Sequence, residues 1–373
     1  MNLHIMPDEK VISRTIQYFE ESLPFQNRYV VITHNDSKKA KFVSECKDNT
    51  FIVKYGSSSF WKAVGDLSSY KNIIVHSLNG YAVDFINNIK HPNITWIAWG
   101  ADLYNFFLEP KGYNLYYNKR EINNLRFSQI PPYKRLFYGL VINLRCRKYQ
   151  KTLKSISNIC AAKSDAQLLL NYYPQIIKKN FWDFYYYPLN DVISPEVLEF
   201  RDAKLGNNII VGNSASFTGN HEEVFLQLST ISLRERKVFV PLSYGNASVV
   251  QYICRKGKQL LNESFTPIMN FMPLDDYNSF LRGACTYIYG SYRQEAFGNI
   301  VVALYLGGSV FLHERNPLLQ DFRNMGCVLF STKELKEKID YRLSLKEVET
   351  NRKLLMSAFS KERLFYLIKS NFG

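Results

Sequence analysis

One stretch of the sequence, NIIVGNSASFTGNHEEVF, has the residue types and spacing of a loop that holds an anionic group. An apolar run ends at Gly212, small polar residues follow, and an amphipathic helical pattern begins near Asn220. A loop between a strand and a helix presents free backbone N–H groups and the positive end of the helix dipole to an anion. The loop lacks the Lys-Ser/Thr pair of a nucleotide-hydrolysing P-loop, so we expect it to hold a diphosphate without hydrolysis. An ordinary strand–turn–helix capped by Asn220 is the alternative. The residues expected to bind are Gly212, Asn213, Ser214, Asn220 and His221.

A second loop with similar chemistry lies in GSYRQEAFGNIVVALYLG. Its Arg293 can pair with a phosphate, and the N-terminus of the apolar helix that follows would point the same way. Glu295 would repel a phosphate, so we expect it to face a sugar or ribose hydroxyl, or to cap the helix. A third polar loop, in FLHERNPLLQDF, opens another helix. Three such loops favour a nucleotide-sugar pocket. The residues assigned to it from these two loops are Arg293, Gln294, Glu295, Gly298, Asn299 and Asn316.

Two residues of the first half are candidates for acting on a hydroxyl group. In WIAWGADLY, Asp102 comes just beyond a strand of buried type. A carboxylate there could take the proton of an attacking sugar hydroxyl, and capping of the next helix is the alternative. His76 ends the run NIIVH and is the second catalytic candidate, against a purely structural role. The sequence has no D-x-D motif and no His/Cys cluster with metal-ligand spacing, so we expect no metal and no cofactor.

The excess of positive charge points to an anionic partner. The chain carries 47 Lys and Arg against 33 Asp and Glu, a formal net charge of +14. The basic segment PPYKRLFYGLVINLRCRKYQKTL places five apolar residues at helical spacing, with cations at either end and around the polar face: Leu136, Phe137, Leu140, Val141 and Leu144. Such a helix could lie on an anionic membrane, and a core-packed helix with a solvated basic face is the alternative. The residues expected to face the membrane or acceptor are Lys134, Arg135, Arg145, Arg147, Lys148 and Lys151.

The order of predicted elements sets the domain organisation. Strand-like and helix-like segments alternate through the first half, and a second α/β series begins after a charged connector at 194–207. Two consecutive series of this kind predict two doubly wound parallel-sheet domains that face each other across a cleft. We expect domains at 1–195 and 207–345, with helices of 346–373 packing back on the first. Six scattered cysteines, no long apolar segment and no signal-peptide pattern predict a cytoplasmic protein.

Several of these blocks resemble the bacterial 4-acetamidofucose transferases, glycosyltransferase family 56. The blocks are WGADLY, VGNS followed by NHEEVF, VPLSYG, and RQEAFGNIVVALYLGG with ERNPLLQDF, in order over 75–322. The resemblance implies a GT-B fold of two Rossmann-like domains, with the donor in the C-terminal one and a lipid-linked acceptor in the N-terminal one. It adds Tyr244, on the VPLSYG block, to the donor residues, and places Asp102 on WGADLY. Glu295 and Ala296 depart from the family pattern, which leaves the identity of the sugar open.

Together the residues and the resemblance predict a glycosyltransferase. We expect a 4-acetamido-4,6-dideoxyhexose, or a related deoxy or amino sugar, to move from a dTDP- or UDP-linked donor to a polyprenyl-diphosphate-linked oligosaccharide without a metal. The enzyme would lie at the inner face of the cell membrane as a peripheral protein. A non-catalytic nucleotide-sugar-binding or scaffold protein is the main alternative. A nucleic-acid-binding protein is disfavoured, because the sequence contains no recognised nucleic-acid-binding motif.

Overall fold

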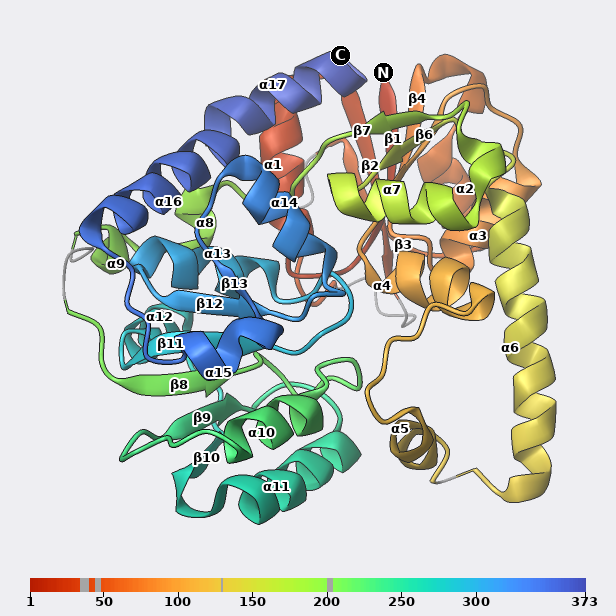
Figure 1. The fold of residues 1–373 in the computed structure, drawn as a ribbon. Coiled ribbons are helices and arrows are strands. Elements are labelled where there is room, and N and C mark those ends of the chain that lie inside the picture. Colours follow the sequence, from red (N-terminus) through yellow and green to blue (C-terminus); the bar gives the residue numbers. More distant parts are fainter. Residues whose placement is uncertain (34–39, 44–47, 129, 200–203) are drawn as a thin grey trace. The chain divides into compact units, whose positions relative to one another are not determined.

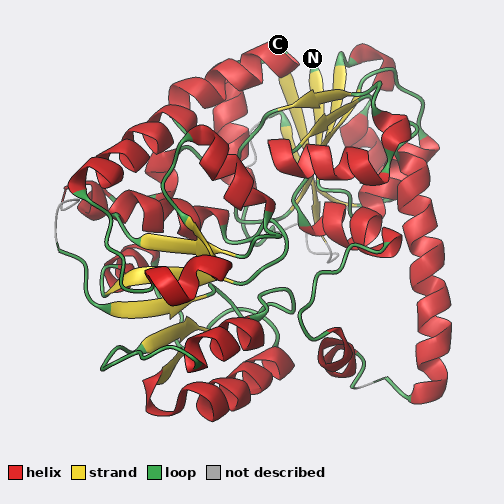
Figure 2. Cartoon of the chain, in the orientation of Figure 1, coloured by secondary structure: helices red, strands yellow, loops and turns green. Residues whose placement is uncertain are grey.

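The computed structural model describes residues 1–33, 40–43, 48–128, 130–199 and 204–373. Within these residues the chain forms two compact units (Figure 1). Unit 1 comprises Met1–Tyr113, Phe137–Pro188 and Lys361–Gly373, and unit 2 comprises Asn114–Leu136 and Leu189–Ser360. Each unit is built around its own parallel sheet, with helices on both sides of the strands (Figure 2).

Unit 1 contains a seven-stranded sheet in the order β3-β2-β1-β4-β5-β6-β7. Its central strands are buried on both faces and rich in Ile and Val, as expected for a parallel sheet covered by helices. The strands are β1 (Asn2–Pro7), β2 (Asn27–Thr33), β3 (Thr50–Lys54), β4 (Asn72–His76), β5 (Ile94–Ile97), β6 (Asn158–Cys160) and β7 (Asn180–Trp182). The longer helices are α1 (Ile12–Ser22), α2 (Ser58–Val64), α3 (Gly80–Asn88), α7 (Lys163–Tyr172) and α17 (Lys361–Phe372). The short helices are α4 (Ala101–Leu103), η1 (Leu67–Ser69), η2 (Tyr104–Leu108), η3 (Glu109–Lys111) and η4 (Pro174–Ile176).

Unit 2 contains a six-stranded parallel sheet in the order β10-β9-β8-β11-β12-β13. Its core is centred on α13, whose residues from Ile300 to Leu306 are all buried. A helix that is apolar on every side has to be covered on every side, and α16 packs against it. The strands are β8 (Asn208–Val211), β9 (Val238–Pro241), β10 (Phe265–Ile268), β11 (Ala284–Tyr289), β12 (Ser309–Leu312) and β13 (Phe330–Ser331). The helices are α5 (Lys119–Arg126), α8 (Leu189–Val192), α9 (Pro195–Glu199), α10 (His221–Ser229), α11 (Ala247–Leu261), α12 (Leu274–Leu281), α13 (Phe297–Leu306), α14 (Pro317–Met325), α15 (Leu335–Lys338) and α16 (Leu345–Ala358), with short helices η5 (Asn262–Ser264) and η6 (Thr332–Glu334).

Both strand orders reverse at one point in the sheet. In unit 1, β2 and β3 lie on one side of β1 and β4 to β7 on the other, so the order reverses between β1 and β4. In unit 2 the same reversal lies between β8 and β11. These orders confirm the predicted class of two doubly wound, Rossmann-like domains. In such sheets, ligands bind outside the carboxyl ends of the strands, at the point of reversal.

The limits of the two units differ from the expected domain limits at two places. The segment Asn114–Leu136 belongs to unit 2, although it comes from the first half of the chain. At the other end, α16 lies in unit 2 and α17 in unit 1. The last helix packs along α1, where Lys361 Nζ pairs with Glu21 Oε2 at 2.7 Å (Figure 1).

Most of the basic segment forms the helix α6 (Pro132–Thr152), which exposes an apolar face. Its second half is anchored by buried Cys146 and Tyr149, whereas Phe137, Leu140 and Leu144 are 69%, 59% and 64% exposed. The side chain of Leu136 lies outside the described part of the structure. No helix among the described residues is both long enough and apolar enough to cross a membrane.

Candidate active site

The loops after β8 and β11 flank the point where the strand order of unit 2 reverses. The loop after β8 begins at Gly212, whose N–H donates to Ile288 O at the end of β11 at 2.9 Å. The loop after β11 begins at Gly290, where a Cβ atom would lie 3.0 Å from Gly219 O. A Cβ atom at Gly290 would also lie 2.8 Å from Val224 Cγ2, so the close contact there requires glycine. The two loops picked out by the sequence therefore lie side by side at the carboxyl edge of this sheet.

His221 packs directly on the first of these loops. Gly212 has φ +69°, and a Cβ atom there would lie 2.4 Å from His221 Nε2, so the ring occupies the space of the missing side chain. The ring is buried, and its Nε2 has no hydrogen-bond partner in the described structure. Burial lowers the pKa of His221 to about 4, against a smaller opposing effect of Glu295. The imidazole is therefore neutral at pH 7.

Glu295 joins the two loops. Its Oε2 accepts three hydrogen bonds, from Thr218 Oγ1 at 2.6 Å, Ser291 Oγ at 3.1 Å and Arg293 Nε at 3.3 Å. Burial alone would raise the pKa of Glu295, but the charge of Arg293 and these hydrogen bonds hold it below its ordinary value. Glu295 is thus a buried carboxylate that ties the loop after β8 to the loop after β11. It does not cap α13, whose N-cap is Ala296 at φ +62°.

Arg293 is held in place by the same contacts. Its Nε donates to Thr218 Oγ1 at 3.1 Å and to Glu295 at 3.3 Å. These bonds use the Nε edge of the guanidinium and fix its plane. An arginine fixed through Nε can still present its two Nη groups to a phosphate in a bidentate manner.

Asn220 connects this loop pair to the segment that enters unit 2 from the first half of the chain. Its Nδ2 donates to Gly290 O at 3.1 Å and to Leu115 O at 3.2 Å, and its Oδ1 accepts from the N–H of Tyr117 at 3.0 Å. The residue adopts φ +47°, a conformation that Asn tolerates better than most residues. Because both ends of its amide are used in this way, Asn220 organises the loops rather than presenting its amide to a ligand.

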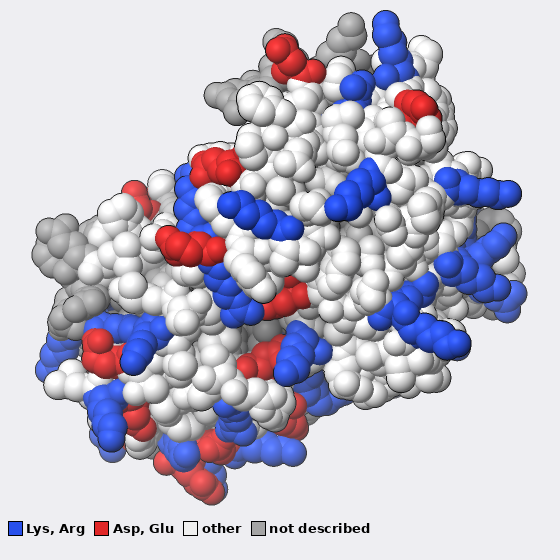
Figure 3. Space-filling view, turned by 90° about the horizontal axis from the view of Figure 1, so that it is seen from above, with Lys and Arg blue, Asp and Glu red and all other residues white. Residues whose placement is uncertain are grey.

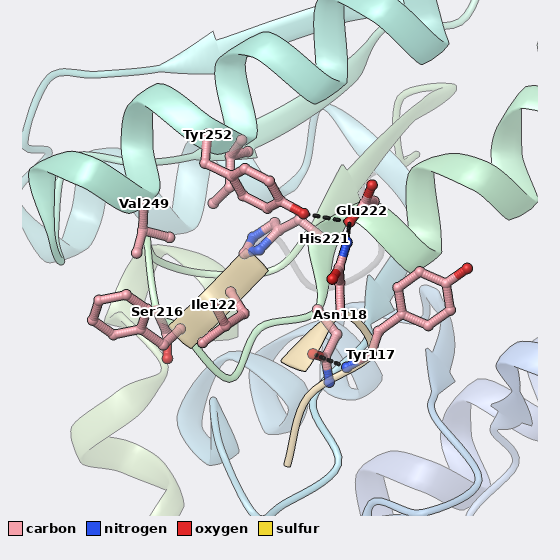
Figure 4. Close-up of a pocket in the computed structure, with 11 residues that line it drawn as sticks. Tyr117, Asn118, Ile122, Ser216, His221, Glu222, Val249 and Tyr252 are labelled. Carbon is pink, nitrogen blue, oxygen red and sulfur yellow. Dashed lines mark hydrogen bonds between the residues drawn. The ribbon is translucent and has the colours of Figure 1, made fainter. Parts of the chain in front are cut away.

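A small cavity lies beside His221, between the segment with α5 and the helices α10 and α11 (Figure 4). Its volume of about 20 Å³ is enough for one water molecule and far too small for a nucleotide. Glu222 points into the same region and accepts hydrogen bonds from Tyr252 and from Asn118 Nδ2, while Lys256 Nζ lies 2.6 Å from its other oxygen. Although burial acts to raise it, these partners hold the pKa of Glu222 below its ordinary value. The cavity is therefore a packed joint that fixes α5 on unit 2.

The other donor residues expected from the sequence differ in how far they are buried. Asn316 is buried and caps α14, with Oδ1 accepting from the N–H of Leu318 at 3.1 Å, and its Nδ2 has no partner in the described structure. Tyr244 follows β9 and is 73% exposed, and Ser214 is buried in the first loop. Asn213 and Gln294 are partly exposed on the two loops, and Gly298 and Asn299 are partly exposed in the first turn of α13. The loops after β8, β11 and β12 follow three strands that are neighbours in the sheet.

Asp102, the predicted base, lies buried in unit 1 with both carboxylate oxygens occupied. Oδ2 accepts from the N–H of Leu78 at 2.7 Å and from Trp96 Nε1 at 2.9 Å. Oδ1 accepts from the N–H groups of Trp99 and Leu103, each at 2.9 Å. The side chain is 3% exposed. This geometry favours a structural role for Asp102, different from the helix cap considered above, in which it joins the loop after β4 to the loop after β5.

His76, the second predicted catalytic residue, lies in a buried chain of hydrogen bonds. Trp99 Nε1 donates to Tyr186 Oη at 2.5 Å, and Tyr186 Oη lies 3.0 Å from His76 Nδ1. His76 Nε2 lies 3.1 Å from His4 Nδ1, and His4 Nε2 lies 3.2 Å from Asn27 Oδ1. Burial lowers the pKa of His4 to about 3 and that of His76 well below its ordinary value. Both rings are therefore neutral and fully engaged, which favours the structural alternative for His76.

The six basic residues predicted to face membrane or acceptor lie on α6, with different surroundings. Lys148 pairs with Asp84, and Arg145 donates to Tyr149 Oη at 3.2 Å and stacks over Phe106. All six are exposed, and the other four are Lys134, Arg135, Arg147 and Lys151. On the face shown in Figure 3, basic side chains gather at the right-hand edge without acidic ones among them, and mix with acidic ones elsewhere.

Some residues of these loops were not singled out in the sequence. Thr218 and Ser291 hold Glu295, and small polar residues inside the two loops were the available signal for them. The attachment of Tyr117 and Asn118 to unit 2 had no local signal, because their partners lie about a hundred residues further along the chain. Among the described residues, no three His, Cys, Asp or Glu side chains come together in a way that could hold a metal ion.

Two doubly wound parallel sheets, each with polar loops at the point where its strand order reverses, are the architecture of GT-B glycosyltransferases. The sequence profile of the family described as 4-alpha-L-fucosyltransferase, glycosyl transferase group 56, matches residues 132–361, which is more than half of the chain. The chain therefore belongs to this family, and the predicted family is confirmed. The protein is an enzyme that transfers sugars.

Solved structures agree on the fold. A trehalose-6-phosphate structure from E. coli with bound UDP-2-fluoro glucose superposes with a TM-score of 0.61 at 9% identity, covering 99% of this chain and 98% of that one. A glycosyltransferase from Rickettsia africae gives a TM-score of 0.56 at 14% identity, with 100% and 94% covered. WaaG, a glycosyltransferase involved in lipopolysaccharide biosynthesis, gives 0.55 at 9% identity, with 99% and 98% covered. At these identities the likeness establishes the fold alone.

Proposed function

We propose that the enzyme transfers a sugar from a nucleoside-diphosphate donor to a polyprenyl-diphosphate-linked oligosaccharide, without a metal ion. The observation that carries the proposal is the buried Nε2 of His221, which lies against Gly212 and has no partner among the described residues. Buried polar atoms in native proteins are nearly always hydrogen-bonded, so an unpaired one at the reversal point of the sheet indicates a ligand atom. In its Nε2–H tautomer the ring would donate to a phosphate oxygen.

Three features of the loop pair would stabilise the charge that develops on the leaving diphosphate. Arg293 is oriented by Glu295 and Thr218, backbone N–H groups follow β8, and α13 begins just after Arg293. Preorganised donors of this kind supply the electrostatic stabilisation that a departing phosphate requires. They also give a physical basis for departure of the diphosphate without a metal, which agrees with the lack of a D-x-D motif in the sequence.

The class of donor is supported by the comparisons. The E. coli structure holds UDP-2-fluoro glucose, a nucleoside-diphosphate sugar. The family description names a fucosyltransferase, and fucose is a 6-deoxyhexose. We propose a dTDP- or UDP-linked donor carrying a 4-acetamido-4,6-dideoxyhexose or a related deoxy or amino sugar.

The acceptor and location are supported by α6. Phe137, Leu140, Val141 and Leu144 follow the i, i+3, i+4, i+7 spacing of one helix face, and all four are exposed. Exposed cations precede and follow this face along the helix. An apolar face flanked by cations suits the interface of an anionic membrane, where the enzyme would meet a polyprenyl-linked substrate as a peripheral protein on the cytoplasmic side.

A thermal-shift titration with dTDP, UDP and GDP tests the donor site. A ligand at 100 times its Kd stabilises the native state by about 2.7 kcal/mol, so one nucleotide should raise Tm clearly. Arg293→Gln should weaken binding of that nucleotide about tenfold or more, because a charge-assisted hydrogen bond contributes roughly 1.5–3 kcal/mol. Lys258→Gln, an exposed position on α11, serves as the control and should bind as the wild type does. No shift with any of the three nucleotides would contradict the proposal.

A further inference from the structure

A second cavity, in unit 1, lies outside the donor loops and has a volume of about 620 Å³, within the range of small-molecule binding sites. It opens at the carboxyl ends of the first five strands. Its lining includes the last residues of β1, β2 and β3 and the loops that follow β4 and β5: Pro7, Thr33, Lys54, Ser77 and Trp99. The strand order of unit 1 reverses between β1 and β4, so this cavity occupies the position where doubly wound sheets bind ligands.

The walls of this cavity combine positive charge with aromatic rings. Lys54 at the end of β3 and Arg145 on α6 supply the charge. Tyr55, Tyr81 and Trp99 supply the rings, and Tyr55 contacts Tyr81 with ring centroids 5.9 Å apart. Cations bind phosphate oxygens, and aromatic rings pack against the C–H face of a sugar through dispersion contacts. This combination suits a sugar joined to a diphosphate.

The cavity wall is held in shape before any ligand binds. Ser77 adopts φ +65°, a strained conformation for a non-glycine residue, and such strain is found where the surroundings fix a functional loop. The next residue, Leu78, donates its N–H to Asp102, and Trp99 donates its N–H to the same carboxylate. Trp99 is also fixed through its indole N–H by Tyr186. Asp102 and the His76 chain therefore act as the frame of this cavity.

Glu9 is the one acidic residue among the described residues that line the cavity. It lies two residues beyond the end of β1, and its side chain is exposed. Asp102 and His76 are buried and fully engaged, which leaves Glu9 as the carboxylate available to a bound hydroxyl. Resting on the sugar-transfer function above, we propose that this cavity binds the sugar–diphosphate end of the acceptor and that Glu9 takes the proton from its attacking hydroxyl.

The proposed step balances as a direct displacement. The acceptor oxygen forms a bond to the anomeric carbon of the donor sugar while the bond from that carbon to the diphosphate oxygen breaks. The bonding electron pair leaves with the nucleoside diphosphate, and the hydroxyl proton passes to the carboxylate of Glu9. Attack by an oxygen activated in this way proceeds from the face opposite the leaving group, so the anomeric configuration of the transferred sugar inverts.

Binding to the cavity can be measured without any donor. The probe is a water-soluble geranyl-diphosphate-linked N-acetylglucosamine, titrated by calorimetry into the full-length protein. Lys54→Gln and Arg145→Gln should each raise its Kd at least fivefold, and Glu9→Gln should leave it within about twofold. Since Arg145 also contacts Tyr149 and Phe106, Arg145→Lys is included, and it should restore most of the affinity. Unchanged affinity in Lys54→Gln and Arg145→Gln would overturn the binding site.

Turnover tests the role of Glu9. A general base contributes roughly 10²–10⁴-fold to the rate, so Glu9→Gln should lower kcat by that factor while the KM for the acceptor changes little. Glu362→Gln, an exposed carboxylate on α17, is the matched control and should keep wild-type turnover. A kcat within twofold of wild type in Glu9→Gln, or retention of configuration in the product by NMR, would overturn the proposal. Wild-type protein that binds the probe through Lys54 and Arg145 but transfers no sugar from any nucleotide donor would instead refute the proposed function and leave the binding site standing.

Discussion

The backbone N–H of Leu78 donates to Asp102 Oδ2 at 2.7 Å and joins the loop after β4 to the loop after β5. The same carboxylate accepts three further N–H groups, so its four hydrogen bonds replace the water that a buried charge loses. A carboxylate used in this way shapes two loops and has no lone pair directed at a substrate. These hydrogen bonds distinguish an aspartate that fixes two loops from an aspartate that acts as a general base.

Asp102→Asn should destabilise unit 1 more than it impairs the chemistry. The amide can accept at one atom only, and its NH₂ group faces N–H donors, so at least one donor is left unpaired at a cost of about 1–3 kcal/mol. Urea unfolding measures this loss. At a temperature where the variant is fully folded, transfer should stay within about tenfold of wild type. A loss of 10³-fold or more in folded protein would instead identify Asp102 as the base.

The sequence predicted where the loops lie along the chain but not the hydrogen bonds that hold them. Buried apolar runs that end in Gly or small polar residues identified the edges of β8 and β11, because parallel strands covered on both faces have that pattern. The partners of Asp102 could not be identified in this way, since the N–H of Leu78 is a backbone group 24 positions away. Glu295 was expected to face a hydroxyl, and the pairing with Arg293 and Thr218 depends on how the two loops meet.

Glu295→Gln should destabilise unit 2 and at the same time increase the stabilisation that a nucleoside diphosphate provides. Arg293 is 14% exposed, and removing the charge of its partner leaves a cation without compensation, at a cost of about 3 kcal/mol. A bound phosphate would then replace the missing carboxylate. The rise in Tm on adding the nucleotide should therefore be larger in the variant than in wild type. Glu337→Gln, at an exposed position on α15, should change neither quantity.

His221 should make stability depend on pH in a defined window. Its pKa is about 4 in the folded protein and about 6.5 in an unfolded chain, so the unfolded state binds more protons between these values. Above pH 6.5 both states are neutral at this site and stability is complete. Below that, stability falls as the pH approaches 4, and it levels off once the folded ring is also protonated. His221→Asn should show a shallower decline over pH 6.5–4 in chemical denaturation, and an equally steep decline would contradict this assignment.

Membrane binding should depend on four of the exposed cations of α6 more than on net charge. Each cation near an anionic surface contributes about 1 kcal/mol, so neutralising four of them should reduce co-sedimentation with vesicles of anionic phospholipid by two orders of magnitude or more. The variant changes Lys134, Arg135, Arg147 and Lys151 to Gln and leaves Arg145 and Lys148 in place, because those two side chains contact Tyr149 and Asp84.

The matched control for α6 carries the same change in net charge at exposed positions of unit 2: Lys258, Lys336, Lys346 and Lys353, each to Gln. A separate pair of changes, Phe137→Asn with Leu144→Asn, removes apolar contact without altering charge. If α6 lies in the interface, this pair should weaken binding even at high salt, where attraction between charges is screened. Equal losses in the α6 variant and its control would mean that the membrane senses only the overall charge of the protein, and the exposed apolar face of α6 would then need another partner.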